Sequence, residues 1–383
     1  MFNDVYRGKK VLVTGHCGFK GSWLTRWLQK LGCQIIGYGH SPRMPASHFQ
    51  LLYPLRCHLE SGDLLDFRKL QNTINTFRPD IVFHLAAKAI VSRTFHEPRE
   101  TFENNVMGTV NLLEACRDQP SIKGIVCITT DKVYENKEWD WGYRENDSLG
   151  GLDPYSASKV CIEHVIKCYR TQFIPHIATA RAGNVIGGGD WAEKRLIPDI
   201  VRATARGDEV EIHTPNATRP WQHVLEPLAG YLTLGQKFLE GVPMVEIRDD
   251  IPCCPVEDIL PGKIWFQMPQ QKPTTTKLYN QFATNWNFGP DGEMTVLDIL
   301  KIAQEVWPKV KYVIKEEETH PSMVELLRID STEAKKVLGW KPRLNMENAV
   351  RWTIDWYKNF YENGKISTDG NIEYYEKLME QSL

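Results

Sequence analysis

Short apolar runs alternate with amphipathic stretches along the first half of the chain. Residues 10–14 (KVLVT) predict a buried strand that ends at a glycine turn, and 22–31 predict the helix that follows. Further strands are predicted at 34–38, 81–85, 124–130 and 176–180, with helical periodicity between them. Strand–helix alternation at this spacing predicts an α/β fold with a parallel sheet covered by helices on both faces.

The pattern changes after about residue 183, where glycine, proline and tryptophan become frequent. We expect a first domain over 1–183 that the chain revisits near 224–238 and 285–300. A smaller substrate-binding domain is expected over 184–223 and 301–383. Residues 241–282 are rich in proline and polar residues and show little periodicity, which predicts an inserted loop or flap.

The composition is typical of a globular protein. Hydrophobic residues make up 42%, enough for a substantial core, and the formal net charge of -2 favours neither nucleic acid nor an acidic membrane as a partner. No run approaches the roughly 18 apolar residues that a membrane-spanning helix needs. The N-terminal MFNDVYRGKKVLVTG lacks the features of a signal peptide. We therefore expect a cytoplasmic protein.

The cysteines favour neither disulfides nor a metal site. There are nine, scattered along the chain, which fits reduced thiols better than a disulfide framework. Cys253 and Cys254 are the close pair, and no second pair or histidine stands at zinc spacing from them. No metal is expected.

Gly15, Gly18 and Gly21 form a G-x-x-G-x-x-G series between a predicted strand and a predicted helix. Glycines let the backbone turn tightly and approach a pyrophosphate at a helix N-terminus, where free N–H groups and the helix dipole favour anions. This context predicts a dinucleotide-binding loop rather than a purely structural turn.

The residues after the second strand leave the choice of dinucleotide open. An NAD site usually has an acidic residue about 20 positions after the glycine loop. This chain has GHSPR at 39–43 instead, where Ser41 and Arg43 would accept a 2′-phosphate unless Arg43 is only a solvated loop residue. Asp63 is either a contact on the adenine side of the cofactor or a helix N-cap.

Tyr155 and Lys159 stand four residues apart at the start of a predicted helix over 156–169. That spacing places both side chains on one helix face. A nearby ammonium lowers the pKa of a tyrosine, which can then act as the base when a sugar hydroxyl is oxidised. The pair predicts hydroxyl oxidation beside the dinucleotide.

Thr129, Thr130, Asp131 and Lys132 follow the apolar strand at 124–128. The carboxyl ends of strands in open α/β sheets present ligand-binding groups. Thr130 can hydrogen-bond a reacting hydroxyl, and Asp131 and Lys132 offer an acid and a base. The alternative is that Asp131 is an N-cap and Lys132 a solvated side chain.

Eight motifs together resemble the CDP-glucose 4,6-dehydratases, which are extended short-chain dehydrogenase/reductases. They are TGHCGFKGSWL, HLAA, NVMGT, TTDKVYENKEW, DPYSASK, RAGNVIGGGDW, RLIPD and RPWQHVLEPL, and they span most of the chain outside 241–282. The resemblance implies a Rossmann-type doubly wound parallel sheet with a smaller C-terminal substrate domain, tightly bound NAD, a nucleotide-sugar substrate and a homodimer. It identifies Tyr155 and Lys159 as the oxidation pair, Thr130 as their helper, and Asp131 and Lys132 as the dehydration pair.

We expect two sets of binding residues, and for Asn184, Arg195 and Arg219 the resemblance implies contact with the nucleotide half of the substrate. The cofactor set is Gly15, Cys17, Gly18, Phe19, Gly21, Ser41, Arg43, Asp63, Leu64, Ala86, Ala87, Asn105, Tyr155 and Lys159. The substrate set is Lys88, Arg93, Asn184, Arg195, Leu196, Arg219 and His223. Lys132 points to the CDP branch, since the dTDP-glucose relatives carry glutamate there.

Three positions depart from the family pattern. Cys17 replaces the usual threonine of the glycine loop, Lys88 stands where glutamine is usual, and the acidic residue after the second strand is missing. The last departure leaves NADP as the alternative cofactor.

Three rival functions are a nucleotide-sugar 4-epimerase, a dehydratase of another nucleotide sugar, and a non-catalytic dinucleotide sensor. An epimerase needs no acid and base beside C5 and C6, so Asp131 and Lys132 argue against it. The retained Thr130, Tyr155 and Lys159 argue against a sensor.

Overall fold

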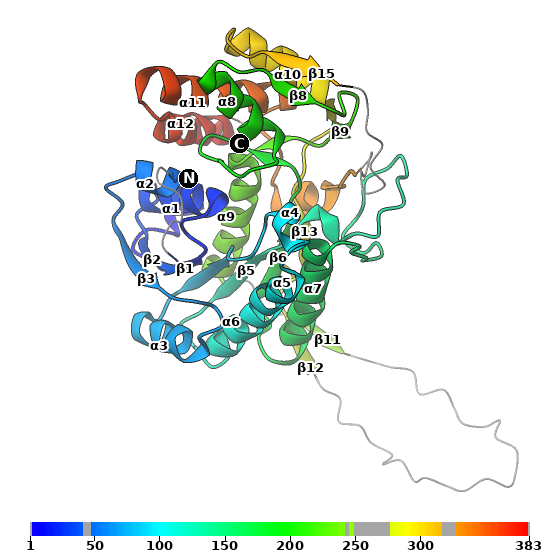
Figure 1. The fold of residues 1–383 in the computed structure, drawn as a ribbon. Helices are drawn as coiled ribbons and strands as arrows, with labels where there is room; N and C mark the ends of the chain where they lie inside the picture. The colour runs from blue at the N-terminus through cyan, green and yellow to red at the C-terminus, as the bar shows by residue number, and fades with distance from the viewer. Residues whose placement is uncertain (1, 41–46, 242–244, 249–275, 316–326, 382–383) are drawn as a thin grey trace, which may run out of the picture.

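The computed structural model describes residues 2–40, 47–241, 245–248, 276–315 and 327–381. Ser41 and Arg43 therefore lie outside the described residues, as does most of the predicted insertion at 241–282. Its two ends, β11 (Val245–Arg248) and β12 (Thr276–Tyr279), pair with each other in antiparallel register. In Figure 1 this pair lies at the end of the sheet remote from α8 (Leu196–Arg206).

A seven-stranded sheet forms the centre of the molecule, in the order β3-β2-β1-β4-β5-β6-β13 (Figure 1). Every neighbouring pair in it is parallel. Its strands are β1 (Lys10–Thr14), β2 (Gln34–Gly39), β3 (Cys57–Ser61), β4 (Ile81–His84), β5 (Gly124–Ile128), β6 (Ile177–Arg181) and β13 (Asn285–Asn287). The strand order reverses between β1 and β4, which is where such sheets bind ligands beyond the carboxyl ends of their strands.

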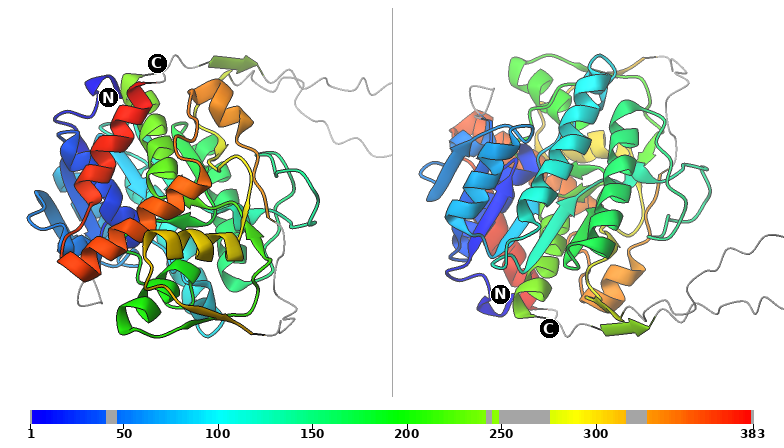
Figure 2. Two further views of the ribbon diagram at one scale, coloured as in Figure 1. Left: turned by 90° about the horizontal axis from the view of Figure 1, so that it is seen from above. Right: turned by 90° about the horizontal axis from the view of Figure 1, so that it is seen from below.

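Helices cover both faces of this sheet because successive side chains of each strand point to opposite sides (Figure 2). Val11 and Val13 of β1 join one apolar core, while Leu12 between them joins the other. The first core includes α1 (Phe19–Lys30) and α9 (Leu225–Glu240). The second includes α3 (Phe67–Phe77), α6 (Gly108–Cys116) and α7 (Pro154–Gln172). The predicted doubly wound α/β fold is confirmed.

A second lobe stands above the sheet in Figure 1. It contains α8, α10 (Val296–Val306), α11 (Met346–Asn363) and α12 (Thr368–Glu380). Its short strands pair β8 (Val210–Ile212) with β15 (Tyr312–Ile314), β9 (Thr218–Arg219) with β14 (Met294–Thr295), and β7 (Val185–Ile186) with β10 (Gln222–His223). Trp307 and Trp356 of this lobe share one apolar core with Trp23 of α1, so the two lobes pack as a continuous unit.

Short helical turns complete the described structure. They are η1 (Phe2–Asp4), α2 (His48–Leu51), α4 (Val91–Thr94), α5 (Pro98–Phe102), η2 (Glu103–Met107), η3 (Asp131–Val133) and η4 (Ala334–Leu338). Within the described ranges, no helix combines the length and apolarity needed to cross a membrane.

The element boundaries differ from the predicted ones where polar residues take over. β5 ends at Ile128 rather than 130, because Thr130 leaves the sheet to become the N-cap of η3. α1 starts at Phe19, three residues early, because Gly18 is its N-cap. β3 was not predicted at all: none of its side chains is buried, so this edge strand has no apolar run.

Candidate active site

The glycine loop joins β1 to α1 with almost no room for side chains. Gly15 has a φ of +71°, and a Cβ there would lie 2.7 Å from the Ala86 nitrogen. A Cβ on Gly21 would lie 2.1 Å from the Gly15 carbonyl oxygen. A Cβ on Gly18 would meet only that oxygen, at 3.4 Å, so the outer side of the loop is open.

Gly18 caps α1 without a side chain, so the N–H groups of the first helical turn, which begins at Phe19, have no side-chain partner at the cap. An open loop that ends in uncapped N–H groups at a helix N-terminus fits the pyrophosphate of a dinucleotide. Cys17 is accommodated at the rim of the loop, where its Sγ donates to the His40 carbonyl at 2.8 Å.

An acidic side chain does stand beside the end of β2, although it comes from beyond β3. The Asp63 carboxylate lies 3.3 Å from His40 Nε2, and its other oxygen accepts the Leu65 N–H at 2.9 Å. The N-cap of α3 is Asp66, so the alternative that Asp63 caps that helix is wrong. Leu64 is buried against Gly108. The pairing of β2 with β3 thus supplies a carboxylate that the sequence after β2 lacks.

Tyr155 and Lys159 lie in the first turns of α7, as their spacing predicts. Asp153 starts the helix, since its carboxylate accepts the N–H groups of Tyr155 and Ser156 at 2.9 and 3.0 Å. Lys159 Nζ donates to the Ile128 carbonyl at the end of β5, at 3.1 Å. α7 is therefore pinned to the strand that carries the Thr130 segment.

Burial has the largest effect on the pKa values of Tyr155 and Lys159. Burial lowers the pKa of Lys159 to about 8 and raises the pKa of Tyr155 to about 12, while a hydrogen bond with Thr130 acts to lower the latter. The expectation of a lowered Tyr155 pKa is wrong in direction, because desolvation of the phenolate outweighs the Thr130 hydrogen bond and the Arg195 charge, which act to lower it.

Thr130 and Asp131 are buried at the end of β5, with exposed fractions of 6% and 3%. Thr130 Oγ1 donates to Asp131 Oδ1 at 3.0 Å, and the Thr130 side chain is the N-cap of η3, so the alternative that Asp131 is an N-cap is wrong. Burial raises the pKa of Asp131. The other carboxylate oxygen packs on Gly183, where a Cβ would come within 1.7 Å. Lys132 is exposed.

Two further residues belong to this region that the sequence did not single out. Glu163 lies one more turn along the Tyr155–Lys159 face of α7, and its carboxylate accepts from Thr129 Oγ1 at 2.7 Å and from Arg181 Nε at 2.9 Å. The spacing i, i+4, i+8 was the available signal.

Lys20 is the second such residue, on the first turn of α1 between two glycines of the loop. Its Nζ makes a long hydrogen bond of 3.5 Å to Tyr231. Burial lowers the pKa of Lys20 to about 8. The charges of Arg195 and Lys159 also act to lower it, and the charge of Asp131 acts to raise it. A lysine inside a glycine loop was the signal in the sequence.

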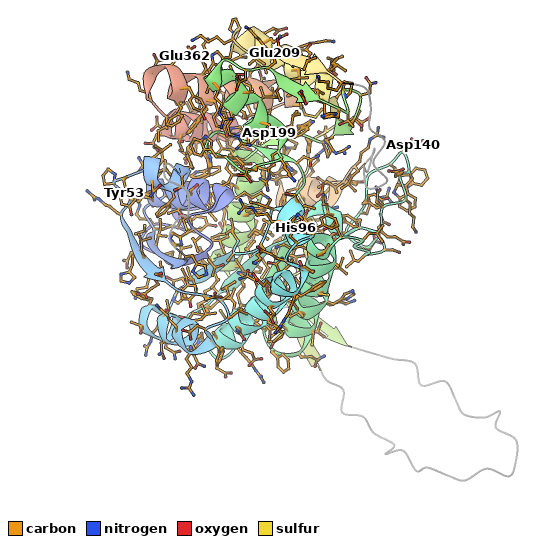
Figure 3. The ribbon with its side chains drawn as sticks, in the orientation of Figure 1. Tyr53, His96, Asp140, Asp199, Glu209 and Glu362 are labelled. Atoms are coloured by element: carbon orange, nitrogen blue, oxygen red, sulfur yellow. The ribbon has the colours of Figure 1, made fainter. Side chains whose placement is uncertain are left out.

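Several predicted binding residues follow β4 or begin α8. Ala86 and Ala87 follow β4 and are partly exposed. Arg195 is the N-cap of α8, donates to Asp190 at 2.8 Å and interacts electrostatically with Tyr155. Leu196 opens that helix and packs on the main core. Figure 3 marks this side of the molecule by His96, just after α4, and Asp199 in α8.

Three other predicted binding residues make contacts with neighbouring residues of the protein. Lys88 Nζ pairs with Glu97 at 2.6 Å and also with Glu100. The Asn105 side-chain amide holds the Lys88 backbone and Ser158 Oγ, at 2.7 and 2.9 Å, so it joins the segment after β4 to α7. Arg93 lies 3.6 Å from Glu193.

The remaining predicted substrate residues are Asn184, directly before β7, Arg219 in β9 and His223 in β10. Asn184 has a φ of +39°, and its carbonyl accepts the Gln222 N–H at 3.2 Å. Arg219 donates to the Thr218 carbonyl at 2.6 Å. His223 is 0% exposed and packs against Trp23 and Trp352, so it offers a substrate no surface in this structure.

Known proteins resemble this chain along most of its length. A model described as the NAD dependent epimerase/dehydratase family matches residues 11–246. The CDP-glucose 4,6-dehydratase of Salmonella typhimurium is 40% identical over 370 residues, covering 93% of this chain and 92% of that protein. The chain belongs to the NAD dependent epimerase/dehydratase family. The predicted resemblance to the CDP-glucose 4,6-dehydratases is confirmed.

Two further proteins resemble this chain at lower identity. The dTDP-glucose 4,6-dehydratase of Shigella flexneri is 26% identical, covering 97% of this chain and 98% of that protein. The crystal structure of UDP-glucose 4-epimerase from Brucella ovis in complex with NAD matches with a TM-score of 0.72 at 20% identity, covering 91% of this chain and 98% of the other. At that identity the match concerns the fold alone, and it agrees with the Rossmann-type sheet.

Proposed function

We propose that this protein is a CDP-glucose 4,6-dehydratase, a hydro-lyase that converts CDP-D-glucose to CDP-4-dehydro-6-deoxy-D-glucose. The observation that carries the proposal is the grouping of an oxidation pair, Tyr155 and Lys159, with the Thr130–Asp131–Lys132 segment at one sheet edge. The identity to the Salmonella enzyme supports CDP-glucose over other nucleotide sugars.

The cofactor we propose is tightly bound NAD. The open loop at Gly15, Gly18 and Gly21 would hold its pyrophosphate, and Asp63 beside His40 would meet its adenosine half. When bound, NAD supplies a reversible hydride acceptor. Denaturing the purified protein and identifying the released dinucleotide tests this choice, and predominantly NADP would contradict it.

The protein residues would move three protons. Tyr155 Oη accepts the proton of the C4 hydroxyl, with Thr130 oriented toward the same hydroxyl. The resulting ketone acidifies C5, whose proton passes to Lys132, or to a water that it orders, and later returns. Asp131 gives a proton to the departing C6 oxygen, which leaves as water. Burial of Asp131 favours the protonated carboxyl that this step needs.

Substrate contacts are proposed for side chains on the approach from α4 and α8. Arg93 and Arg195 are cationic and suit a diphosphate, while Asn184, Leu196 and Arg219 would meet the nucleotide. Lys88 is not proposed for the diphosphate, because its Nζ already pairs with Glu97 and Glu100. By the same likeness we propose a cytoplasmic homodimer, whose mass in solution can be measured by light scattering.

Mass spectrometry after incubation with a panel of nucleotide sugars tests the function. Loss of one water from CDP-glucose supports the dehydratase. Isomerisation without a mass change would favour a 4-epimerase, loss of water from another nucleotide sugar would change the substrate, and an unchanged panel would favour a dinucleotide sensor.

A further inference from the structure

One buried ion pair holds both ends of the segment that carries the proposed acid. Thr129 and Tyr134 flank residues 130–133. The Thr129 hydroxyl donates to Glu163 Oε1 at 2.7 Å, and Arg181 Nη1 donates to the Tyr134 hydroxyl at 2.8 Å. Glu163 and Arg181 are joined to each other by hydrogen bonds of 2.9 and 3.0 Å. The two charged side chains therefore bracket η3, the turn after β5.

Tyr134 is linked directly to the proposed acid, Asp131. Its backbone N–H donates to the Asp131 carbonyl at 3.2 Å across the single turn of η3. On its other side, the Asp131 carboxylate packs on Gly183, where a Cβ would come within 1.7 Å of Oδ2. Gly183 stands two residues after Arg181, on the chain that leaves β6. A shift of Tyr134 would therefore move Asp131 against a neighbour that leaves it little room.

The ion pair itself has no surface for a substrate. The Glu163 and Arg181 side chains are 2% and 1% exposed. Arg181 donates to protein groups from all three guanidinium nitrogens: to Glu163 through Nε and Nη2, and to Tyr134 and the Glu145 carbonyl through Nη1. The pair can therefore influence the chemistry only through the groups that it holds.

The geometry of the pair makes it a stiff support. A guanidinium and a carboxylate joined by two hydrogen bonds fix each other's orientation as well as their distance, and charge-assisted bonds are stronger than neutral ones. Catalytic groups must be held within about 0.5 Å of their productive positions. A displacement of about 1 Å can cost about 10²-fold in rate. The support thus lies where a small movement would matter.

We propose that Tyr134, Glu163 and Arg181 are positioning residues for the dehydration step, an inference that rests on the proposed dehydratase function. They hold the Asp131 carboxyl where it can give its proton to the departing C6 oxygen. Their effect on the reaction passes through Asp131, and none of the three is a catalytic residue.

The oxidation pair has supports of its own. The Asp153 carboxylate caps α7 at Tyr155, at 2.9 Å from its N–H, and Lys159 Nζ donates to the Ile128 carbonyl at 3.1 Å. Neither contact involves Tyr134. Loosening the Tyr134 end of the segment should therefore slow elimination and spare oxidation.

The test removes one hydroxyl and leaves the ion pair in place, because a variant that lacks either charge is expected to be strongly destabilised. Tyr134→Phe deletes the hydroxyl that Arg181 holds and keeps the ring, which stacks on Tyr143 with centroids 5.1 Å apart. Tyr143→Phe is the matched control. Both tyrosines are 2% exposed, but the Tyr143 hydroxyl bonds to Asn136 and to the Lys137 N–H instead of the ion pair.

Enzyme with bound cofactor is mixed with saturating CDP-glucose. Absorbance of the reduced nicotinamide follows oxidation, and rapid quench with mass spectrometry counts the sugar that has and has not lost water. For Tyr134→Phe we expect elimination to slow about tenfold, less than the roughly 10²–10⁴-fold loss for removing the acid itself, with oxidation within about twofold of wild type. Tyr143→Phe should match wild type in both steps.

A double variant tests whether Tyr134 acts through Asp131. Asp131→Asn has no carboxyl proton to give, so the position of that side chain no longer matters for acid catalysis. Adding Tyr134→Phe to Asp131→Asn should therefore slow elimination by less than about twofold more, because effects that share one group are not additive. A further loss of about tenfold would mean that Tyr134 acts independently of Asp131, and it would overturn the proposal.

Hydrogen exchange followed by mass spectrometry needs no substrate. The N–H groups of Val133 and Tyr134 donate to the carbonyls of Thr130 and Asp131. Tyr134→Phe should speed exchange in peptides that cover this turn, because local opening becomes easier, and Tyr143→Phe should not. Exchange at the wild-type rate in Tyr134→Phe would contradict the positioning role, whatever the substrate.

The failures of the two proposals can be told apart. A wild-type enzyme that leaves CDP-glucose unchanged contradicts the dehydratase function. An active wild type overturns the positioning role alone if Tyr134→Phe slows both steps equally, or if Tyr143→Phe shows the same losses.

Discussion

At the scale of single residues, the proposed oxidation and elimination steps are assigned to side chains from two different elements. Tyr155 and Lys159 come from α7, whereas Asp131 and Lys132 come from the turn after β5. Asp131 is buried and Lys132 is exposed, so the two members of the proposed dehydration pair sit in different dielectric surroundings. A buried carboxyl is suited to hold a proton, and an exposed lysine needs the bound substrate to exclude water around it.

This division predicts opposite outcomes for substitutions in the two groups. Tyr155→Phe should prevent oxidation, so that mixing with CDP-glucose gives no nicotinamide absorbance of the reduced cofactor. Asp131→Asn and Lys132→Ala should slow elimination about 10²–10⁴-fold and leave the reduced signal in place. Saturating substrate removes effects of weakened binding.

Lys137→Ala is a suitable control for Lys132→Ala, because Lys137 is an exposed lysine a few residues along the same segment. It should behave as wild type. Normal turnover of both Asp131→Asn and Lys132→Ala would mean that these residues are structural, and the case against an epimerase-like activity would lose its main support.

At the scale of elements, a buried ion pair joins the three elements that position the chemistry. Glu163 of α7 binds Arg181 of β6 through two hydrogen bonds of 2.9 and 3.0 Å, and the pair is 2% and 1% exposed. Although burial alone would raise the pKa of Glu163, the Arg181 charge lowers it. The contact of Glu163 with Thr129 extends the network to the end of β5.

Glu163→Gln should destabilise the fold by about 3–5 kcal/mol, because it leaves the Arg181 guanidinium buried without a counter-charge. Denaturant unfolding of the variant and wild type measures this. Glu373→Gln, which removes an exposed partner of Lys30, is the matched control and should cost at most about 1 kcal/mol. A loss for Glu163→Gln as small as that of the control would contradict the proposed role of the pair.

At the scale of the whole molecule, the Glu226 carboxyl joins the second lobe to a helix that covers the sheet. Glu226 on α9 accepts the N–H groups of Arg343 and Leu344 at 3.0 and 2.7 Å and the hydroxyl of Tyr375 in α12 at 2.7 Å. Burial raises the pKa of Glu226 to about 7, more than these donors lower it. We therefore expect the contact between the two lobes at Glu226 to depend on pH.

The direction of the pH dependence of stability follows from the raised pKa of Glu226. A group whose pKa rises on folding stabilises the fold fully below its unfolded value, near 4.5, and loses that contribution as the pH rises through about 7. Ionising Glu226 should thus cost on the order of 3 kcal/mol across this window. Thermal unfolding of wild type and Glu226→Gln between pH 5 and 7.5 should give a smaller pH dependence for the variant.

Some pH dependence should remain in Glu226→Gln, since burial also raises the pKa of Glu145 to about 7. The overall stability of the variant is expected to be lower, because an amide cannot accept all the hydrogen bonds that Glu226 accepts. Two parallel pH curves would show that Glu226 does not titrate in this window.

Local patterns in the sequence determined the parts of this protein that depend on near neighbours along the chain. Buried strands such as β1 and β4 follow from short apolar runs, and the tight loop at Gly15 follows from the glycine spacing. The shared face of Tyr155 and Lys159 follows from the helical repeat. The long motifs identified the family, because they contain residues from both lobes in a fixed order.

Only the tertiary structure decided which distant residues meet. Asp63 reaches His40 because β3 pairs with β2, Glu163 reaches Thr129 because α7 packs beside β5, and Glu226 reaches Tyr375 because α12 packs on α1, which also contacts α9. Burial is likewise a property of the assembled core: it hides His223 and sets the pKa directions of Tyr155, Lys159 and Asp131. These contacts join residues that no local repeat relates, so the sequence by itself could not place them.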